Sequence, residues 1–171
     1  MTTFFAVAHL AELAPLEVHR LYKLRVDVFV HEQATPYAEI EDLDAAAGTV
    51  HVMALQTRRV DGHTTTELVG TARLSPEEVA GEQVIRLGRI IVAPAERGTG
   101  LAQELIATAL RHVAEKHPDT DVVLSAQEPL TGYYEKFGFR PVGGLTDDTG
   151  VPHQPMLLHA AELEGLVSQP V

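Results

Sequence analysis

The stretch from residue 84 to residue 116 constrains the fold more than any other part of the chain. The β-branched run Ile90-Ile91-Val92 is followed by Arg97-Gly98-Thr99-Gly100, and a helical pattern then begins. In that pattern apolar residues recur at every fourth position, at Leu101, Leu105, Ala109 and Val113. This order predicts a strand, a glycine-rich turn and a helix that ends before Pro118.

The glycine-rich turn has the features of an anion site. Gly98 and Gly100 permit positive φ angles and the close approach of another molecule. The first turn of the following helix leaves N–H groups without intrahelical partners, and the helix dipole favours phosphate there. The spacing is not that of a P-loop, which needs G-x-x-x-x-G-K-[ST]. It is not that of a dinucleotide turn either, because Ala102 replaces the third glycine at a different offset. The alternative is a tight connection whose glycines serve only the turn.

The segment Arg97-Gly98-Thr99-Gly100-Leu101-Ala102, preceded by Val92-Ala93-Pro94, resembles the pyrophosphate turn of the GNAT N-acetyltransferase superfamily. The resemblance implies that backbone amides of this turn hold the pyrophosphate of acetyl-CoA. It also implies that the end of the preceding strand, residues Ile90, Ile91 and Val92, pairs with the pantetheine arm. Gln127, at the end of a later predicted strand, either lines the CoA cleft or is a surface amide.

Further blocks in the same order extend the resemblance to the ElaA branch of this superfamily, over about residues 20 to 156. They are Leu21-Tyr22-x-Leu24-Arg25, Val28-Phe29-Val30-x-Glu32-Gln33, Pro36-Tyr37, Gly88-Arg89, Ala126-Gln127, Tyr134-x-x-Phe137-Gly138-Phe139, Pro141-Val142 and Pro152-His153. The sequence departs from the family in the hairpin that begins at Asp147, where Thr149 marks an extra residue or a shift. The placement of His153 is therefore open.

The strand pattern indicates one α/β domain over residues 1–171. Strands are predicted at 4–8, 50–59, 67–74 and 84–92 with a hairpin at Asp61-Gly62-His63, which forms an antiparallel meander. The run at 122–126 follows the central helix and suits a parallel neighbour of strand 84–92. The resemblance implies a GNAT fold, a mixed and mostly antiparallel sheet with a central V-shaped splay, flanked by helices.

Weaker patterns predict the remaining elements. A helix of about four turns begins at Pro15, and a short helix covers 130–137. A strand follows at 139–142, the segment 143–155 is turn-rich, and 156–159 closes a terminal hairpin. The tail after Glu162 carries no assignment.

Cysteine content and charge exclude several function classes. The chain has no cysteine, which removes disulfides, thiolate zinc sites and a cysteine acyl-enzyme, so direct transfer is the simpler route for an acyl group. The net charge of −11 argues against nucleic acid and suits an amine partner. Because CoA is anionic too, its capture must rest on local groups such as the turn amides and Arg97.

Membrane and metal functions are not predicted either. No apolar run approaches the ~20 residues of a membrane span, and the N-terminal segment lacks the basic region of a signal peptide, so we expect a cytoplasmic location. His31-Glu32 resembles the start of an H-E-x-x-H zinc motif, but Thr35 stands where the second histidine is needed.

Acetyl transfer to an amine needs a proton donor for the leaving thiolate and an acceptor for the amine proton. The resemblance assigns Tyr134 as general acid, and a tyrosine pKa of about 10 suits that role. Packing on the sheet is the alternative for Tyr134, and Tyr133 is the second choice. Glu32 is a candidate base or ammonium ligand, or a local cap. His153 has a suitable pKa, although any one of nine histidines can be structural.

The segment from Val30 to Asp44 is predicted to be a loop rich in acidic residues. Two roles are equally supported for it, contact with the substrate and a solvent-exposed acidic surface. Arg25 and Arg89 lie within apolar segments, where burial requires carboxylate partners, so a structural ion pair is predicted for each.

These observations favour an N-acetyltransferase that moves acetyl from acetyl-CoA directly to an amine of a small molecule or peptide, without a metal. The pattern Arg25-x-x-Val28-Phe29 also resembles acyl-homoserine lactone synthases, which would imply longer acyl chains and another acceptor. A non-catalytic domain that binds acyl-CoA as a sensor or interaction module is a further alternative. The sequence names neither the acceptor nor the oligomeric state, and a homodimer stays open.

Overall fold

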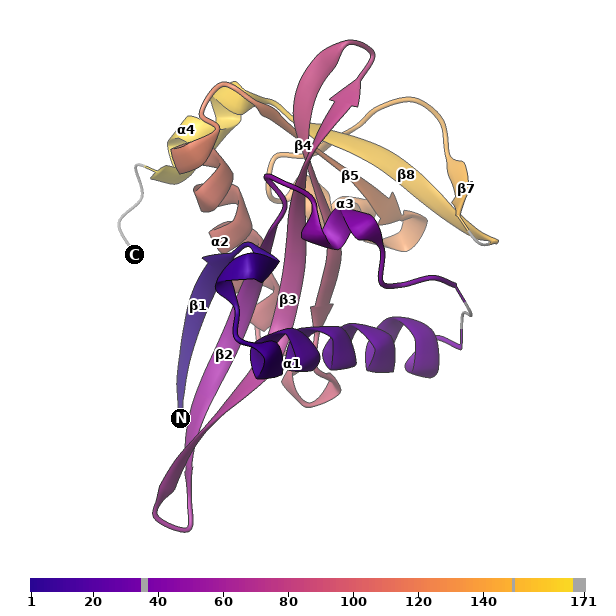
Figure 1. Cartoon of the computed structure of the whole chain (residues 1–171). Helices are drawn as coiled ribbons and strands as arrows, with labels where there is room; N and C mark the ends of the chain where they lie inside the picture. Colours follow the sequence, from indigo (N-terminus) through magenta and orange to yellow (C-terminus); the bar gives the residue numbers. More distant parts are fainter. Residues whose placement is uncertain (35–36, 149, 168–171) are drawn as a thin grey trace. The chain divides into compact units, whose positions relative to one another are not determined.

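The computed structural model describes residues 1–34, 37–148 and 150–167 and contains a mixed eight-stranded sheet with four α-helices. The hydrogen-bonded strand order is β1-β2-β3-β4-β5-β8-β6, and β7 pairs with β8 (Figure 1). The chain divides into two compact units, which we call the first unit (1–75 and 89–108) and the second unit (76–88 and 109–171). The strands β3 (His63–Val79) and β4 (Glu82–Val92) and the helix α2 (Leu101–Lys116) pass from one unit into the other.

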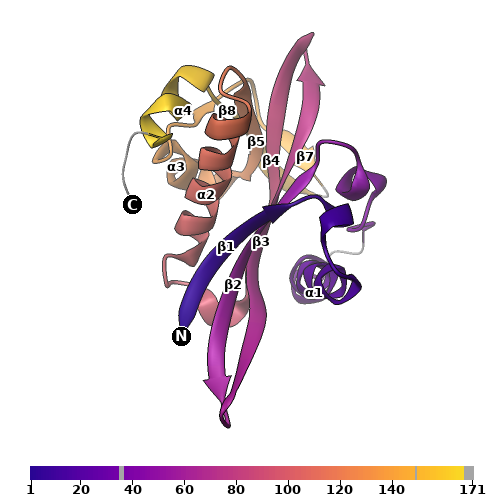
Figure 2. The same ribbon diagram turned by 60° about the vertical axis from the view of Figure 1, so that its left-hand side comes forward.

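The first unit is built on an antiparallel meander. Strand β1 (Thr2–Ala8) pairs with β2 (Val50–Val60), which pairs with β3 across a turn at Asp61-Gly62. Both turn residues have positive φ, 49° and 82°, as a type I′ hairpin turn requires. Helix α1 (Pro15–Arg25) and the first half of α2 cover opposite faces of these strands (Figure 2). The core between them includes Leu21, Val52, Ala54, Ala72, Leu105 and Ile106.

The helix predicted from Pro15 is present, but its last part is π-helical. After α1 the segment η2 (Val26–Glu32) continues with wider turns, and the N–H of Gln33 donates to the carbonyl of Val28, five residues earlier. The segment ends at Glu32, and two residues later Ala34 has a positive φ of 53°. π-Helical turns are rare and are frequently found at functional sites.

The second unit contains the parallel pair that the sequence predicted. Residues Val84–Arg86 of β4 pair in parallel with Asp121–Val123 of β5 (Asp121–Gln127). This pairing leaves most of β5 outside it, as the expected splay requires. On its other edge β5 pairs antiparallel with β8 (Val151–Leu158), which also pairs with β6 (Arg140–Pro141) and β7 (Thr146–Asp148).

Several predicted boundaries were wrong. Strand β8 begins at Val151, inside the segment predicted to be turn-rich, because β7 precedes it as a hairpin partner whose Asp147 accepts a hydrogen bond from the N–H of Gly150. Strand β3 extends well past the predicted range 67–74 at both ends. Helix α3 is shorter than predicted (Thr131–Glu135), and so is β6.

The chain after β8 forms a helix that the sequence did not predict. Helix α4 (Ala160–Val167) lies beside the C-terminal half of α2 (Figure 1) and buries Leu163 completely. Its first N–H, from Ala160, donates to the carboxylate of Asp121 at the start of β5. Among the described residues no helix combines the length and apolar character that crossing a lipid bilayer would need.

Candidate functional site

The predicted glycine-rich turn lies in the first unit, between β4 and α2. Gly98 and Gly100 have φ angles of 76° and 86°, and a Cβ on either residue would meet no atom within 4 Å. The hydroxyl of Thr99 donates to the carbonyl of Glu96 at 2.6 Å and accepts from the N–H of Leu101 at 3.4 Å. Glycine is therefore required by backbone conformation and not by packing, and the space over the turn is open.

The turn is anchored to β2 by a buried carboxylate. Glu96 is only 8% exposed and accepts hydrogen bonds from Gln56 and Arg58, each at 3.1 Å. Gln56 is buried as well, so the hydrogen bond between Gln56 and Glu96 is shielded from solvent. A buried carboxylate with two donors is costly to move, and it fixes the backbone just before Arg97.

Two of the predicted site residues contact each other. The guanidinium of Arg97 donates from Nη1 and Nη2 to the two carboxylate oxygens of Glu32, at 2.6 and 2.9 Å. Both side chains are exposed to solvent by more than a third. The hydrogen bonds from Arg97 stabilise the ionised carboxylate and so lower the pKa of Glu32. Glu32 is therefore ionised and engaged in this structure, a state that does not favour proton abstraction.

The end of β4 packs tightly on β3. The N–H of Ala93 donates to the carbonyl of Val69 at 2.7 Å, and a Cβ on Gly70 would lie 3.3 Å from the carbonyl oxygen of Ile91. Ile91 is buried, whereas Ile90 and Val92 are half-buried. The pairing of this segment with a pantetheine arm stays a prediction.

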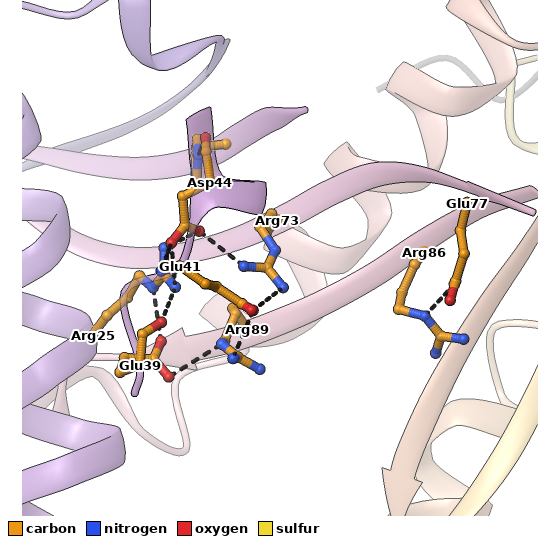
Figure 3. Close-up of polar contacts among 9 residues, drawn as sticks. Arg25, Glu39, Glu41, Asp44, Arg73, Glu77, Arg86 and Arg89 are labelled. Atoms are coloured by element: carbon orange, nitrogen blue, oxygen red, sulfur yellow. Dashed lines mark hydrogen bonds and ion pairs between the residues drawn. The ribbon is translucent and has the colours of Figure 1, made fainter. Parts of the chain in front are cut away.

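Three arginines hold the acidic segment 39–44 in what we call the arginine clamp, formed by Arg25, Arg73 and Arg89 with Glu39, Glu41 and Asp44 (Figure 3). Arg25, from the end of α1, donates to Glu39 at 2.8 Å and to Asp44 at 2.6 Å. Arg73 of β3 donates to Asp44 at 2.9 Å and to Glu41 at 3.2 Å.

The third arginine of the clamp comes from β4. Arg89 contacts Glu41 at 3.1 Å and Glu39 at 3.1 Å, and its guanidinium lies 5.9 Å from the ring centre of Tyr37. It has a positive φ of 51°, which is uncommon for a residue other than glycine, asparagine or aspartate. The ion pairs predicted for Arg25 and Arg89 are confirmed.

The centre of the clamp is buried, Arg89 and Glu41 are partly exposed, and the charges of the six residues balance. Arg25 and Asp44 are fully buried and Glu39 is 3% exposed, so the solvated face considered for this loop does not apply to Glu39 and Asp44. Burial alone would raise the pKa of Asp44, but hydrogen bonds from Arg25, the backbone of Glu41 and Arg73 lower it overall. The three carboxylates thus neutralise the three guanidinium groups. Thr35 and Pro36, in the same predicted loop, lie outside the described residues.

Tyr134 lies in the second unit, on α3. It is 9% exposed, and its ring makes edge contacts with Tyr133 and Phe139 at centroid distances of 5.4 and 6.2 Å. Burial raises the pKa of Tyr134 to about 12, with a smaller contribution from Tyr133. The phenol therefore keeps its proton at physiological pH. Tyr133, the second choice, is less buried, and burial raises its pKa as well.

The second unit also brings Gln127 and His153 together. They are partners in the β5–β8 register, at the end of β5. Nδ1 of His153 lies 2.8 Å from the carbonyl of Val151. Because a carbonyl only accepts, this contact requires the proton on Nδ1, which leaves the Nε2 lone pair of a neutral ring available as a base. Thr149, where the family pattern shifts, lies outside the described residues.

Comparison with known proteins identifies the fold. Residues 20–160 match the family model of the acetyltransferase (GNAT) domain. The ElaA protein of Escherichia coli is 34% identical over 145 residues, 85% of this chain and 89% of that protein. Its crystal structure superposes with a TM-score of 0.81, over 92% of this chain and 100% of that one, at 31% identity.

A second solved structure is equally similar. The acyl-CoA N-acyltransferase of Pseudomonas aeruginosa has a TM-score of 0.81 and 34% identity, over 92% of this chain and 99% of that one. The chain therefore belongs to the GNAT acetyltransferase family, and within it to the relatives of ElaA. A CoA-dependent acyl-homoserine lactone synthase superposes with a TM-score of 0.74 over 99% of this chain and 92% of that one, but at 16% identity it shares the fold alone.

Proposed function

We propose that this protein transfers acetyl from acetyl-CoA directly to an amine of a small molecule or peptide. The observation that carries the proposal is the turn Arg97–Ala102, which has two positive-φ glycines, open space above them and the N-terminus of a 16-residue helix behind them. Such a turn presents converging N–H groups to an anion, and the pyrophosphate of CoA has the matching charge.

Each residue predicted for the cofactor has a task in this proposal. Gly98, Thr99, Gly100, Leu101 and Ala102 supply backbone amides to the pyrophosphate, and Arg97 supplies a guanidinium. Ile90, Ile91 and Val92 offer backbone groups to the pantetheine arm, and Gln127 an exposed amide. The anchored Glu96 keeps the turn in place.

The chemical step needs two proton movements. The amine nitrogen attacks the thioester carbonyl carbon and the carbon–sulfur bond breaks, and Tyr134 donates its phenolic proton to the leaving sulfur. The amine loses a proton to a base, for which His153 offers Nε2. Once the Glu32 carboxylate is released from Arg97, it either binds the ammonium form of the acceptor or accepts a proton from the amine. A cytoplasmic location, where acetyl-CoA is made and used, is part of the proposal.

Incubation of the protein with acetyl-CoA and a panel of amines tests the proposal. The panel contains monoamines, polyamines, amino acids and short peptides, and the readouts are free thiol and the mass of the amine product. We expect thiol release that depends on the amine and a product heavier by one acetyl group. Acetyl-CoA binding without transfer to any amine would replace the proposal by the sensor alternative, and transfer only from long-chain acyl-CoA would replace it by the synthase alternative.

A further inference from the structure

The guanidinium at the predicted phosphate turn already holds an anion. Arg97 binds both carboxylate oxygens of Glu32, which lies 65 residues earlier in the chain, at the end of η2. The side chains are 46% and 40% exposed, so the pair faces solvent and has no packing role in the core. In the part of the chain that the structure describes, Glu32 is the carboxylate that occupies Arg97.

A carboxylate and a phosphate use the same donors of an arginine. The planar guanidinium offers parallel N–H groups whose spacing fits two oxygens of either anion. Glu32 uses Nη1 and Nη2 at once, so it occupies one complete edge of the group. A pyrophosphate that binds at this edge of Arg97 must therefore displace the Glu32 carboxylate.

We propose that Glu32 is an internal competitor of acyl-CoA, which holds Arg97 in the unliganded protein and is displaced by the pyrophosphate. This inference rests on the proposed function, because it takes the Arg97–Ala102 turn as the pyrophosphate site. Displacement leaves the Glu32 carboxylate without its arginine and available to a cationic acceptor.

The local backbone suits a contact that opens. Glu32 ends a π-helical segment, and the positive φ of Ala34 follows two residues later. The wide hydrogen-bonded turns of η2 are less favourable than those of α1, so a change at Glu32 does not require a break in a regular helix. In the opposite role, Glu32 would hold Arg97 in the orientation that binds phosphate. Removal of the Glu32 charge would then weaken CoA binding instead of strengthening it.

The test compares CoA affinity in matched charge variants by calorimetric titration. Glu32→Gln keeps the size of the side chain and removes its charge, and we expect CoA to bind about two- to fivefold more tightly, the effect of one exposed ion pair. Asp27→Asn is the control, because Asp27 pairs with Lys23 on the same stretch of helix and both are exposed. It makes the same change in net charge and should leave the affinity unchanged.

A double-variant comparison isolates the contact. In an Arg97→Gln background, Glu32→Gln should have no effect on CoA affinity, because the competing pair no longer exists. Unchanged or weaker binding in Glu32→Gln alone, or an equal gain in Asp27→Asn, would overturn the inference while acyl-CoA binding stands. Absence of CoA binding in the wild type would overturn the proposed function, and this inference with it.

Discussion

Replacement of Arg25 by methionine will lower the free energy of unfolding by about 3–5 kcal/mol. Arg25 and Asp44 are fully buried and Glu39 is nearly so, and Arg25 donates to both carboxylates. The variant leaves these charges in the interior with only part of their compensation, and the cost of an uncompensated buried charge exceeds that of a lost surface contact. Urea denaturation followed by circular dichroism measures the change.

A matched control lies two residues earlier on the same helix. Lys23 pairs with Asp27 at the surface, with side-chain exposures of 64% and 51%. Lys23→Met should cost less than 1 kcal/mol, because exposed ion pairs contribute little. Arg25→Lys keeps the positive charge but loses the planar set of N–H donors of the guanidinium. Its loss of unfolding free energy should therefore fall between those of the two methionine variants. Equal small losses for Arg25→Met and Lys23→Met would show that the arginine clamp does not hold the segment 39–44.

Replacement of Tyr134 by phenylalanine will lower kcat by about 100-fold or more and leave the affinity for acetyl-CoA nearly unchanged. The substitution removes the hydroxyl alone, so the edge contacts with Tyr133 and Phe139 are kept. Loss of the proton donor leaves the thiolate to depart unprotonated. Steady-state kinetics with an amine from the panel, beside a calorimetric titration with acetyl-CoA, separates the two effects. An unchanged kcat would remove Tyr134 from the role of general acid.

Two controls accompany this variant. Tyr133→Phe removes the neighbouring hydroxyl and should have a much smaller effect on kcat. Tyr134→Phe should also change alkaline stability, because burial raises the folded-state pKa of Tyr134 from about 10 to about 12. As the pH rises from about 10 to about 12, the tyrosine of the unfolded state loses its proton before that of the folded state. The free energy of unfolding of the wild type therefore falls by up to about 3 kcal/mol over this range, and that of the variant does not. Below pH 10 this difference should vanish.

The strand, turn and helix around Arg97 could be predicted because their signals are local. The fourfold spacing of apolar residues from Leu101 sets the helix, and the two glycines with positive φ set the turn. The ion pairs of Arg25 and Arg89 could be predicted as well, because a buried arginine in an apolar segment needs a carboxylate partner. Their partners could not, because Glu39 and Asp44 are brought to them by tertiary folding.

Other features depend on contacts that a single sequence does not reveal. Strand β8 was predicted too short because its first residues alternate poorly, and pairing with β5 and β7 determines its start. The buried anchor Glu96 was missed, since a glutamate beside a turn usually faces solvent. Its burial is explained by hydrogen bonds from Gln56 and Arg58, which lie far earlier in the chain on β2. The contact between Glu32 and Arg97 had no local signal either.

The central claim is that the turn from Arg97 to Ala102 binds the pyrophosphate of acetyl-CoA. Calorimetric titration of the wild type and of Gly100→Glu with acetyl-CoA tests it most directly, because the new carboxylate stands where the phosphates would bind. Gly62→Glu is the control, since Gly62 has a similar φ of 82° and equally open surroundings in the β2–β3 hairpin. We expect saturable binding by the wild type and Gly62→Glu and none by Gly100→Glu. Wild-type protein that does not bind acetyl-CoA, or Gly100→Glu that binds it equally well, would contradict the claim.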